Sequence, residues 1–174
     1  MTTATLPPVA LAPLPPRAPA TRWHRAAEFS VRPAREDDGP ALATLSRPFV
    51  RTGALRERPV SQYLAEARDF LVAQAPDGTV EGCVGLREHP DAGVLFNFCV
   101  AGHRQGSGMG GRLLYAAFAR ARSRSLTTLF TATTGSGRLF LRHGFVPADP
   151  ELAPRDWARS LDPARNARVL ARSL

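Results

Sequence analysis

Two spacings of apolar residues along the chain predict strands that alternate with helices between residues 29 and 174. Continuous or alternating apolar runs predict strands at 29–33, 70–74, 80–86, 94–100, 127–132, 145–146 and 167–174. Pro76-Asp77-Gly78 holds residues suited to a tight turn, so the strands on either side of it should form an antiparallel hairpin. The run 94–100 is almost entirely apolar, which is typical of a strand whose two faces are both covered.

Apolar positions three and four residues apart predict helices between these strands. The first helix should hold the acidic residues 36–38 in its first turn, and a short second helix should follow the charged loop 52–59. Ser61 is the expected cap of the second helix, and Tyr63 and Leu64 are its expected buried residues. A longer helix after a glycine-rich segment should bury Leu113, Leu114, Ala117, Phe118 and Ala121. Further short helices are predicted at 136–142 and 153–160.

Residues 1–27 differ from the rest of the chain in composition. Prolines at 7, 8, 13, 15, 16 and 19 deny this segment both helical and strand hydrogen bonds, so we expect a disordered tail. We assign residues 28–174 to one domain, because that length suffices for a single hydrophobic core. The chain has no apolar run of about 18 residues and does not begin with a basic region followed by a hydrophobic one. We therefore expect a cytoplasmic protein without a membrane partner.

Charge and cysteine content narrow the classes of function. The net charge is +8, and all 23 residues counted as Lys or Arg are arginines, which excludes chemistry through a lysine Schiff base. The arginines are scattered without a basic run, so we expect no nucleic-acid partner, and a polyanionic cofactor with an acidic substrate is favoured. Cys83 and Cys99 lie inside apolar runs without metal-ligand spacing. They should be buried free thiols in a reducing compartment, with no metal site.

The glycine-rich segment is the strongest candidate for a binding site. It leads from an apolar strand into the longer helix through glycines at 106, 108, 110 and 111. Glycine lets backbone N–H groups approach a ligand, and a helix start adds unpaired donors, so phosphate oxygens are the natural occupant. An ordinary glycine-rich connection is the alternative. The segment is neither a Walker loop, because Gly111 is followed by Arg112, nor a Rossmann fingerprint, because it comes late in the chain without an acidic ribose partner.

The segment Gln105-Gly106-Ser107-Gly108-Met109-Gly110 resembles the pyrophosphate loop of the GNAT acetyltransferase superfamily, whose pattern is Gln/Arg-x-x-Gly-x-Gly/Ala. The predicted order of elements over 28–174 is also similar to the GNAT fold. The resemblance implies an α/β (α+β) domain with a single mixed central sheet of about six to seven strands flanked by helices. It also implies acetyl-CoA as co-substrate, without a metal. The residues that would bind acetyl-CoA are Phe98, Cys99, Val100, Gln105, Gly106, Ser107, Gly108, Met109, Gly110, Gly111 and Phe140.

Three further segments resemble the catalytic domain of N-acetylglutamate synthase. They are Gly53-Ala54-Leu55-Arg56-Glu57-Arg58, then Ala132-Thr133-Thr134 with Phe140-Leu141-Arg142-His143-Gly144-Phe145, and Ala164-Arg165-Asn166-Ala167-Arg168-Val169-Leu170. The resemblance implies an N-acetyltransferase of arginine biosynthesis that acts on the α-amine of glutamate or a related carboxylated amino acid. Arg58 and Arg165 match the family arginines that bind the carboxylates of the acceptor. The similarity is to short forms without an amino-acid-kinase domain, so arginine feedback through such a domain is not expected.

The chain departs from the family pattern at positions that matter for catalysis. Val94 stands where the family commonly has a glutamate suited to deprotonating the amine. Glu88 is the nearest acidic alternative, unless it is a solvated turn residue. Ala167 replaces a serine that would partner the carboxylate of the substrate.

The other catalytic candidates are Thr133 and Asn97. Phe140 stands where many GNAT enzymes use a tyrosine to protonate the departing thiolate, and Thr133 is the substitute that we name. A β-branched residue that merely ends a strand is the other interpretation of Thr133. Asn97 interrupts an apolar strand, so it either braces the sheet through hydrogen bonds or faces the substrate.

Two other functions remain open at this point. One is acetylation of a different amine, such as an antibiotic or a protein N-terminus. The other is acetyl-CoA binding without turnover, which the missing glutamate suggests. A homodimer also remains open.

Overall fold

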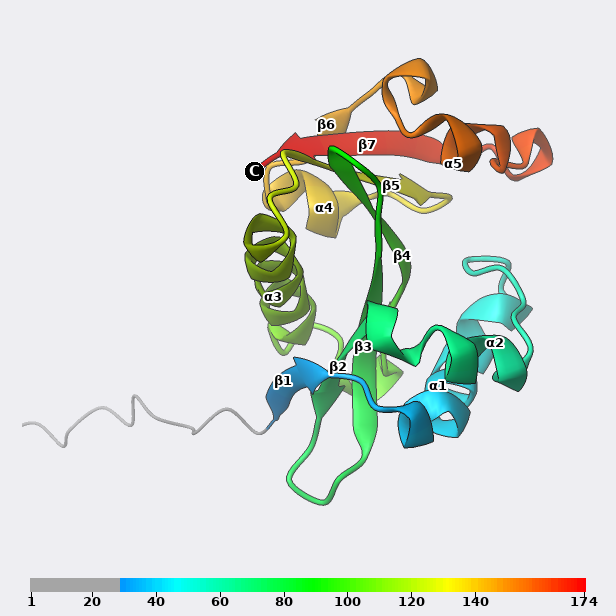
Figure 1. Ribbon diagram of the computed structural model, residues 1–174. Helices are drawn as coiled ribbons and strands as arrows, with labels where there is room; N and C mark the ends of the chain where they lie inside the picture. The colour runs from blue at the N-terminus through cyan, green and yellow to red at the C-terminus, as the bar shows by residue number, and fades with distance from the viewer. Residues whose placement is uncertain (1–28) are drawn as a thin grey trace, which may run out of the picture.

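A mixed sheet forms the centre of the protein (Figure 1). The computed structural model describes residues 29–174, so the tail expected over 1–27 lies outside the described residues. Within the described range seven strands pair in the order β1-β2-β3-β4-β5-β7-β6. The strands are β1 (Ser30–Pro33), β2 (Phe70–Gln74), β3 (Val80–Glu88), β4 (Ala92–Val100), β5 (Thr128–Thr133), β6 (Val146–Pro147) and β7 (Arg168–Ser173). Only the β4–β5 pairing is parallel among these strands, which confirms the predicted mixed sheet.

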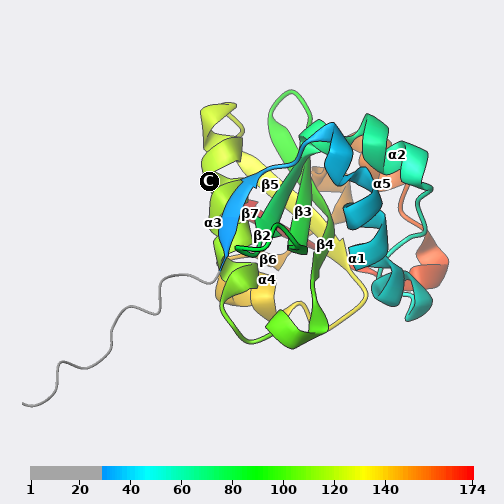
Figure 2. The same cartoon turned by 90° about the horizontal axis from the view of Figure 1, so that it is seen from below.

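Helices cover both faces of the sheet (Figures 1 and 2). The α-helices are α1 (Gly39–Arg51), α2 (Val60–Ala65), α3 (Met109–Ser123), α4 (Arg138–Arg142) and α5 (Arg155–Arg159). Short 3-10 turns are η1 (Glu36–Asp38), η2 (Ala67–Asp69), η3 (Gly102–Arg104), η4 (Pro150–Leu152) and η5 (Pro163–Arg165). Helices α3 and α4 pack on one face, while α1 and α2 pack on the other. No helix in the described part of the chain is long and apolar enough to cross a membrane.

The larger core lies between α3 and the sheet. All the residues predicted for the buried face of α3 are buried, at 0% or 1% exposure: Leu113, Leu114, Ala117, Phe118 and Ala121. Burial of a Leu or Phe side chain stabilises a fold by about 1.5 to 3 kcal/mol. This helix is therefore held firmly against the sheet, and its first turn has a fixed position.

The prediction for α2 was wrong in two respects. The helix begins at Val60 with Pro59 as its N-cap, and no side chain caps it, so Ser61 is not the cap. Leu64 is 42% exposed, whereas Tyr63 is buried as expected. The reason is the length of the helix: six residues present one narrow face to the sheet, and Tyr63 takes that position. Leu64 lies one residue further around the helix and beside α1.

The two cysteines are buried and free, as predicted. They lie opposite each other on β3 and β4, with their Sγ atoms 3.5 Å apart. The hydrogen bond with Cys99, together with burial, raises the pKa of Cys83 well above its usual value. Cys83 is therefore a protonated packing residue at neutral pH.

Strands β4 and β5 separate halfway along their length. Their pairing runs from Ala92 with Thr128 to Leu95 with Thr131 and goes no further. Beyond that point β5 pairs only with β7, and residues 96–100 of β4 pair only with β3, among the strands of the described chain. The backbone of 96–100 therefore keeps hydrogen-bonding groups on the β5 side that are not used in the sheet.

A β-bulge in β4 lies at this point of separation. Cys83 pairs with Cys99 but Gly85 pairs with Phe96, so β4 holds one extra residue opposite Val84. Asn97 adopts a left-handed conformation with φ of 47°, which asparagine tolerates better than most residues. Because of the extra residue, Phe96 and Asn97 both line the same pocket instead of facing opposite sides of the sheet.

Candidate functional site

The glycine loop before α3 is open on its outer side. Gly106 and Gly108 have φ of 80° and 86°, and a Cβ added at either position would meet no other atom within 4 Å. The left-handed conformation, rather than lack of space, therefore requires glycine at both positions. Gly108 is the N-cap of α3, so the first N–H groups of this 15-residue helix lie beside the open space. This geometry suits an anionic group.

Gly110 and Gly111 have a different role from the two glycines before them. A Cβ at Gly110 would lie 3.0 Å from Leu139, and a Cβ at Gly111 would lie 3.0 Å from His143 Nε2. These glycines therefore allow α3 to approach α4 closely. Their contact with acetyl-CoA stays a prediction.

A buried carboxylate anchors the turn that leads into the loop. Glu81, 6% exposed, accepts hydrogen bonds from His103 Nε2 at 2.9 Å and from Arg104 Nε at 2.6 Å. Burial alone would raise the pKa of Glu81, but these hydrogen bonds outweigh it and lower the pKa. Gln105 Nε2 donates to the Val100 carbonyl at 3.3 Å and ties the loop back to β4. Nothing in the spacing of the sequence pointed to Glu81 as the anchor.

Aromatic packing closes the α4 side of the gap between β4 and β5. The rings of Phe98 and Phe140 meet edge to face, with centroids 5.5 Å apart, and Phe140 also packs on Phe145. Phe140 is buried and forms part of the core beside the gap, whereas Phe98 is half-buried. The predicted acetyl-CoA residues of β4, the loop and α4 thus gather around one gap.

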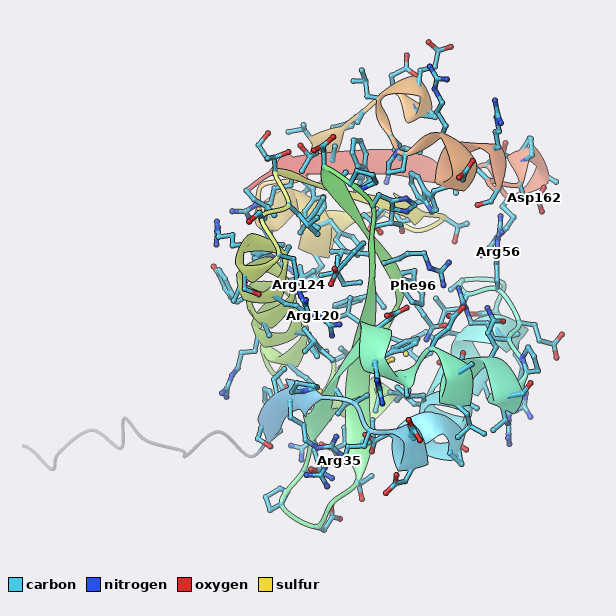
Figure 3. The ribbon with its side chains drawn as sticks, in the orientation of Figure 1. Arg35, Arg56, Phe96, Arg120, Arg124 and Asp162 are labelled. Carbon is cyan, nitrogen blue, oxygen red and sulfur yellow. The ribbon has the colours of Figure 1, made fainter. Side chains whose placement is uncertain are left out.

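A pocket of about 430 Å³ lies on the side of the sheet away from α3. Its lining comes from the loop 54–58, the end of β3, residues 94–97 of β4, the end of β5, and the segment 157–167. Phe96, Arg56 and Asp162 all point into this region (Figure 3). The pocket is therefore assembled from segments that are far apart in the sequence.

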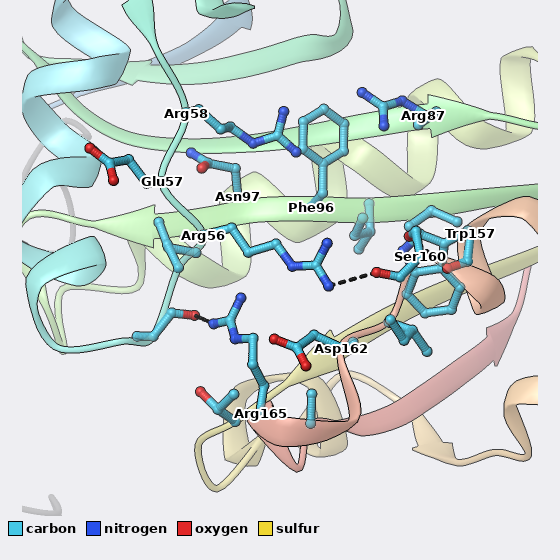
Figure 4. A pocket seen from close by; sticks show the side chains of 18 of the residues that line it. Arg56, Glu57, Arg58, Arg87, Phe96, Asn97, Trp157, Ser160, Asp162 and Arg165 are labelled. Atoms are coloured by element: carbon cyan, nitrogen blue, oxygen red, sulfur yellow. Dashed lines mark hydrogen bonds between the residues drawn. The ribbon is translucent and has the colours of Figure 1, made fainter.

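Arginines dominate the charge of the pocket (Figure 4). Among the described residues, its lining includes Arg56, Arg58, Arg87 and Arg165. The structure brings the two predicted arginines, Arg58 and Arg165, into the same pocket. Sequence reasoning missed Arg56 and Arg87 as pocket residues. Arg56 lies in a family-like segment, but no motif marked Arg87.

Each of the four arginines is held by at least one partner, and two of them share the same carboxylate. Arg58 and Arg87 each bind Glu66, and Arg56 Nη2 donates to the Ser160 carbonyl at 2.7 Å. Arg165 Nη2 donates to the carbonyls of Gly53 and Ala54 at 2.7 and 3.1 Å. Arg56 and Arg165 thus connect the loop after α1 to the segment before β7. A guanidinium has five N–H donors, so each retains donors for a ligand.

Asn97 both braces the sheet and lines the pocket. Its Nδ2 donates to Ser46 Oγ at 2.9 Å, and its Oδ1 accepts from the Tyr63 hydroxyl at 3.1 Å. Burial raises the pKa of Tyr63, so this hydroxyl remains a donor at neutral pH. The bracing alternative for Asn97 is confirmed. Contact with a substrate stays a prediction.

The remaining catalytic candidates, Glu88 and Thr133, lie outside the pocket lining. Val94 does line it, but is 1% exposed and packs with apolar residues of β5 and β7. Glu88 lies 3.5 Å from Arg124 Nε, and Thr133 Oγ1 accepts a hydrogen bond from Gly135 N. Their proposed roles stay predictions.

Two carboxylates of the described chain do line the pocket, Glu57 and Asp162, and sequence reasoning missed both. Asp162 Oδ1 also accepts a hydrogen bond from Ala164 N at 2.9 Å and begins η5. No group of three or more metal-ligating side chains occurs within residues 29–174.

The separating strands, the β4 bulge and the glycine loop at the start of α3 define a GNAT acetyltransferase domain. Residues 66–147 match the family described as acetyltransferase (GNAT) domain, so this part of the chain belongs to that superfamily. Within it, the chain resembles amino-acid acetyltransferases. It is 34% identical over 146 residues to the amino-acid acetyltransferase of Ralstonia nicotianae, covering 83% of this chain and 32% of the relative. The corresponding Escherichia coli K12 protein is 31% identical, with 83% of this chain and 33% of the relative covered.

Solved structures agree with this placement. The N-acetylglutamate synthase of Neisseria gonorrhoeae, complexed with coenzyme A and N-acetyl-glutamate, superposes with a TM-score of 0.80 at 29% identity, over 86% of this chain and 36% of that one. A Mycobacterium tuberculosis protein in complex with CoA and NLQ gives a TM-score of 0.71 at 25% identity, over 83% and 99% of the two chains. The chain thus spans about a third of the length of the curated relatives, at 32% to 33%.

Proposed function

We propose that this protein is an acetyl-CoA-dependent N-acetyltransferase that acts on the α-amine of glutamate or a related carboxylated amino acid. The observation that carries the proposal is the arginine-lined pocket beside the gap between β4 and β5. A carboxylated amine would find guanidinium partners there, and its amine could reach an acetyl group held in the gap. The acceptors named for the relatives support this choice of substrate class.

The chain fits acetyl-CoA on the other side of the same gap. Open space outside Gly106 and Gly108 leaves room for a pyrophosphate, and the N–H groups at the start of α3 can donate to it. Backbone groups of residues 96–100 that are not paired in the sheet can hydrogen-bond an extended arm, as β-strand addition does. Bound acetyl-CoA supplies an activated acetyl thioester. The β4 backbone would orient it and donate to its carbonyl oxygen.

The amine must lose a proton before it can attack. An α-ammonium group with a pKa of about 9 to 10 is mostly charged at neutral pH. Val94 offers no base, because its side chain is a hydrocarbon, and the residues packed around it are apolar as well. Glu57 and Asp162 are the pocket carboxylates within the described residues, and either can receive the proton directly or through water. Asp162 is the better placed, since its backbone hydrogen bond fixes the carboxylate at the pocket wall.

Thiol release from acetyl-CoA in the presence of a panel of amines tests the proposal. Glutamate or another carboxylated amino acid should give the highest kcat/KM, while putrescine and an aminoglycoside should give little or no release. Faster release with an amine that lacks a carboxylate would overturn the choice of acceptor. Tight binding of acetyl-CoA without release for any amine would instead support a binding protein. Location in the cytoplasm, a homodimer and a place in arginine biosynthesis stay predictions.

A further inference from the structure

The geometry points to Glu66 as a positioning residue that fixes two arginines for carboxylate recognition, and to Arg87 as a specificity-determining residue. We call the group formed by Arg58, Glu66, Arg87 and Phe96 the Glu66 clamp. The inference rests on the proposed function and extends it, because it says which side chains select a carboxylated acceptor and how their positions are set.

The Glu66 clamp is built on a single bridging carboxylate. Glu66 Oε2 accepts from Arg58 Nη1 at 2.8 Å, and Glu66 Oε1 lies 2.8 Å from Arg87 Nη2. Because each oxygen serves a different guanidinium, one side chain sets the position of both arginines. Gln62 Nε2 also donates to Glu66 Oε1 at 3.1 Å, which fixes the carboxylate itself.

An aromatic ring separates the two guanidinium groups. The Cζ atoms of Arg58 and Arg87 lie 4.8 and 4.9 Å from the centroid of the Phe96 ring. The ring stands between the two side chains at the pocket wall (Figure 4). Stacking on an aromatic ring restricts the plane of each guanidinium, so the remaining N–H donors have defined directions.

The position of Glu66 explains why it acts through the arginines. Arg58, Arg87 and Phe96 line the pocket, whereas Glu66 is absent from the lining and contacts the arginines from behind. Two positive charges and one negative charge leave the Glu66 clamp with a net charge of +1 on the pocket side. The clamp can therefore attract an anion while its arginines are already ordered.

The fixed positions of Arg58 and Arg87 before the acceptor arrives should strengthen binding. A long side chain that is fixed before the ligand arrives loses little rotamer freedom on binding. A carboxylate accepts two hydrogen bonds from one guanidinium fork, whereas an amide presents an NH2 donor toward the same N–H groups. The Glu66 clamp should therefore favour glutamate over an acceptor in which one carboxylate is replaced by an amide.

The decisive variant is Glu66→Gln, since two explanations of the pocket predict opposite results for it. If only net positive charge attracted the acceptor, removing the negative charge of Glu66 would lower the KM for glutamate. If Glu66 positions Arg58 and Arg87, the KM for glutamate should rise by about tenfold, because both forks lose their fixed direction. The KM for acetyl-CoA and the melting temperature should stay close to the parent values.

Arg87→Gln provides a second, independent variant on a more exposed side chain. It should raise the KM for glutamate by about tenfold as well. It should also reduce the preference for glutamate over at least one of its two monoamides, glutamine and isoglutamine, and the affected monoamide identifies the carboxylate bound by the clamp. Arg87→Lys should fail to restore this preference, because an ammonium lacks the planar fork.

Glu36→Gln and Arg68→Gln are matched controls. These side chains form an exposed ion pair, 3.6 Å apart, outside the pocket, so the same charge changes should leave every kinetic constant unchanged. A lower KM for glutamate in Glu66→Gln, or an unchanged preference in Arg87→Gln, would overturn the Glu66 clamp and leave the proposed function standing. Absence of transfer to any carboxylated amine by the parent protein would overturn both.

Discussion

The glycine loop and the arginine pocket lie on either side of one gap, yet they arise from the sequence in different ways. The loop takes its shape from residues 105–108 and the helix that follows them, so the residues that form this site are consecutive in the sequence. The pocket draws on segments from residue 54 to residue 167. The loop offers backbone donors, whereas the pocket offers charged side chains. The two regions should therefore respond to substitution in separable ways, one through acetyl-CoA and the other through the acceptor.

The largest expected effect belongs to the pocket. Arg165→Ala should raise the KM for glutamate by about 10- to 100-fold, because a carboxylate loses charged hydrogen bonds, while the KM for acetyl-CoA stays within about twofold. We expect the same change in the KM for glutamate for Arg58→Ala. Steady-state kinetics with each substrate varied in turn gives both constants. Arg159→Ala, a nearby exposed arginine outside this pocket, is the control. Equal rises in the KM for glutamate and the KM for acetyl-CoA would contradict the claim that the pocket and the loop bind different substrates.

The loop should show the opposite pattern. Gly108→Glu places bulk, a strained backbone and negative charge where phosphates are expected, so affinity for acetyl-CoA should fall by more than tenfold. Calorimetric titration measures this affinity directly.

Gly78→Glu is the matched control for the loop variant. Gly78 also has a positive φ, 91°, but lies in the turn between β2 and β3. The control should lower stability without changing acetyl-CoA affinity. Equal affinity of Gly108→Glu and the parent would remove the loop from the site.

Asn97 lies between the two regions and should affect stability first. Asn97→Gly keeps the left-handed backbone accessible but removes the partners of Ser46 and Tyr63, at a cost of about 1 to 3 kcal/mol in unfolding free energy. Urea denaturation gives this value. A raised KM for the acceptor in the same variant would indicate that Asn97 also contacts the substrate, besides bracing the sheet. No change in stability would argue against the brace.

The smallest effect concerns the anchor of the loop at low pH. The pKa of Glu81 is lowered in the folded protein, so its contribution to stability is present above the usual carboxylate pKa of about 4 and is lost as the pH falls through the lowered value. Below about pH 4, the melting temperature of Glu81→Gln should therefore fall less steeply with decreasing pH than that of the parent protein. Asp38, whose pKa is lowered by Arg32, accounts for a further part of the stability lost at low pH, and the Asp38→Asn variant measures that part separately. Identical acid profiles of Glu81→Gln and the parent would contradict this assignment.

Local sequence patterns predicted the strands and the buried face of α3, because periodicity and turn residues act over short distances. The mixed sheet was predicted only through the resemblance to the GNAT superfamily. Leu64 was assigned wrongly because the length of α2 and its packing beside α1 decide which of its residues is buried. Ser61 was assigned wrongly as the cap because the helix begins one residue earlier, at Val60. Arg87, Glu66 and Asp162 could not be predicted as site residues. A single charged residue in a strand or helix carries no signal of its partners, and only the tertiary fold brings these segments together.

The central claim is that the arginine pocket selects a carboxylated amino acid for acetylation. Mass spectrometry of the products formed from acetyl-CoA and an equimolar mixture of amino acids, polyamines and an aminoglycoside tests it most directly. The predicted result is an N-acetylated, carboxylated amino acid as the main product, with glutamate as the leading acceptor, and its loss from the Arg165→Ala reaction. A main product without a carboxylate, or one that Arg165→Ala still forms at the parent rate, would contradict the claim.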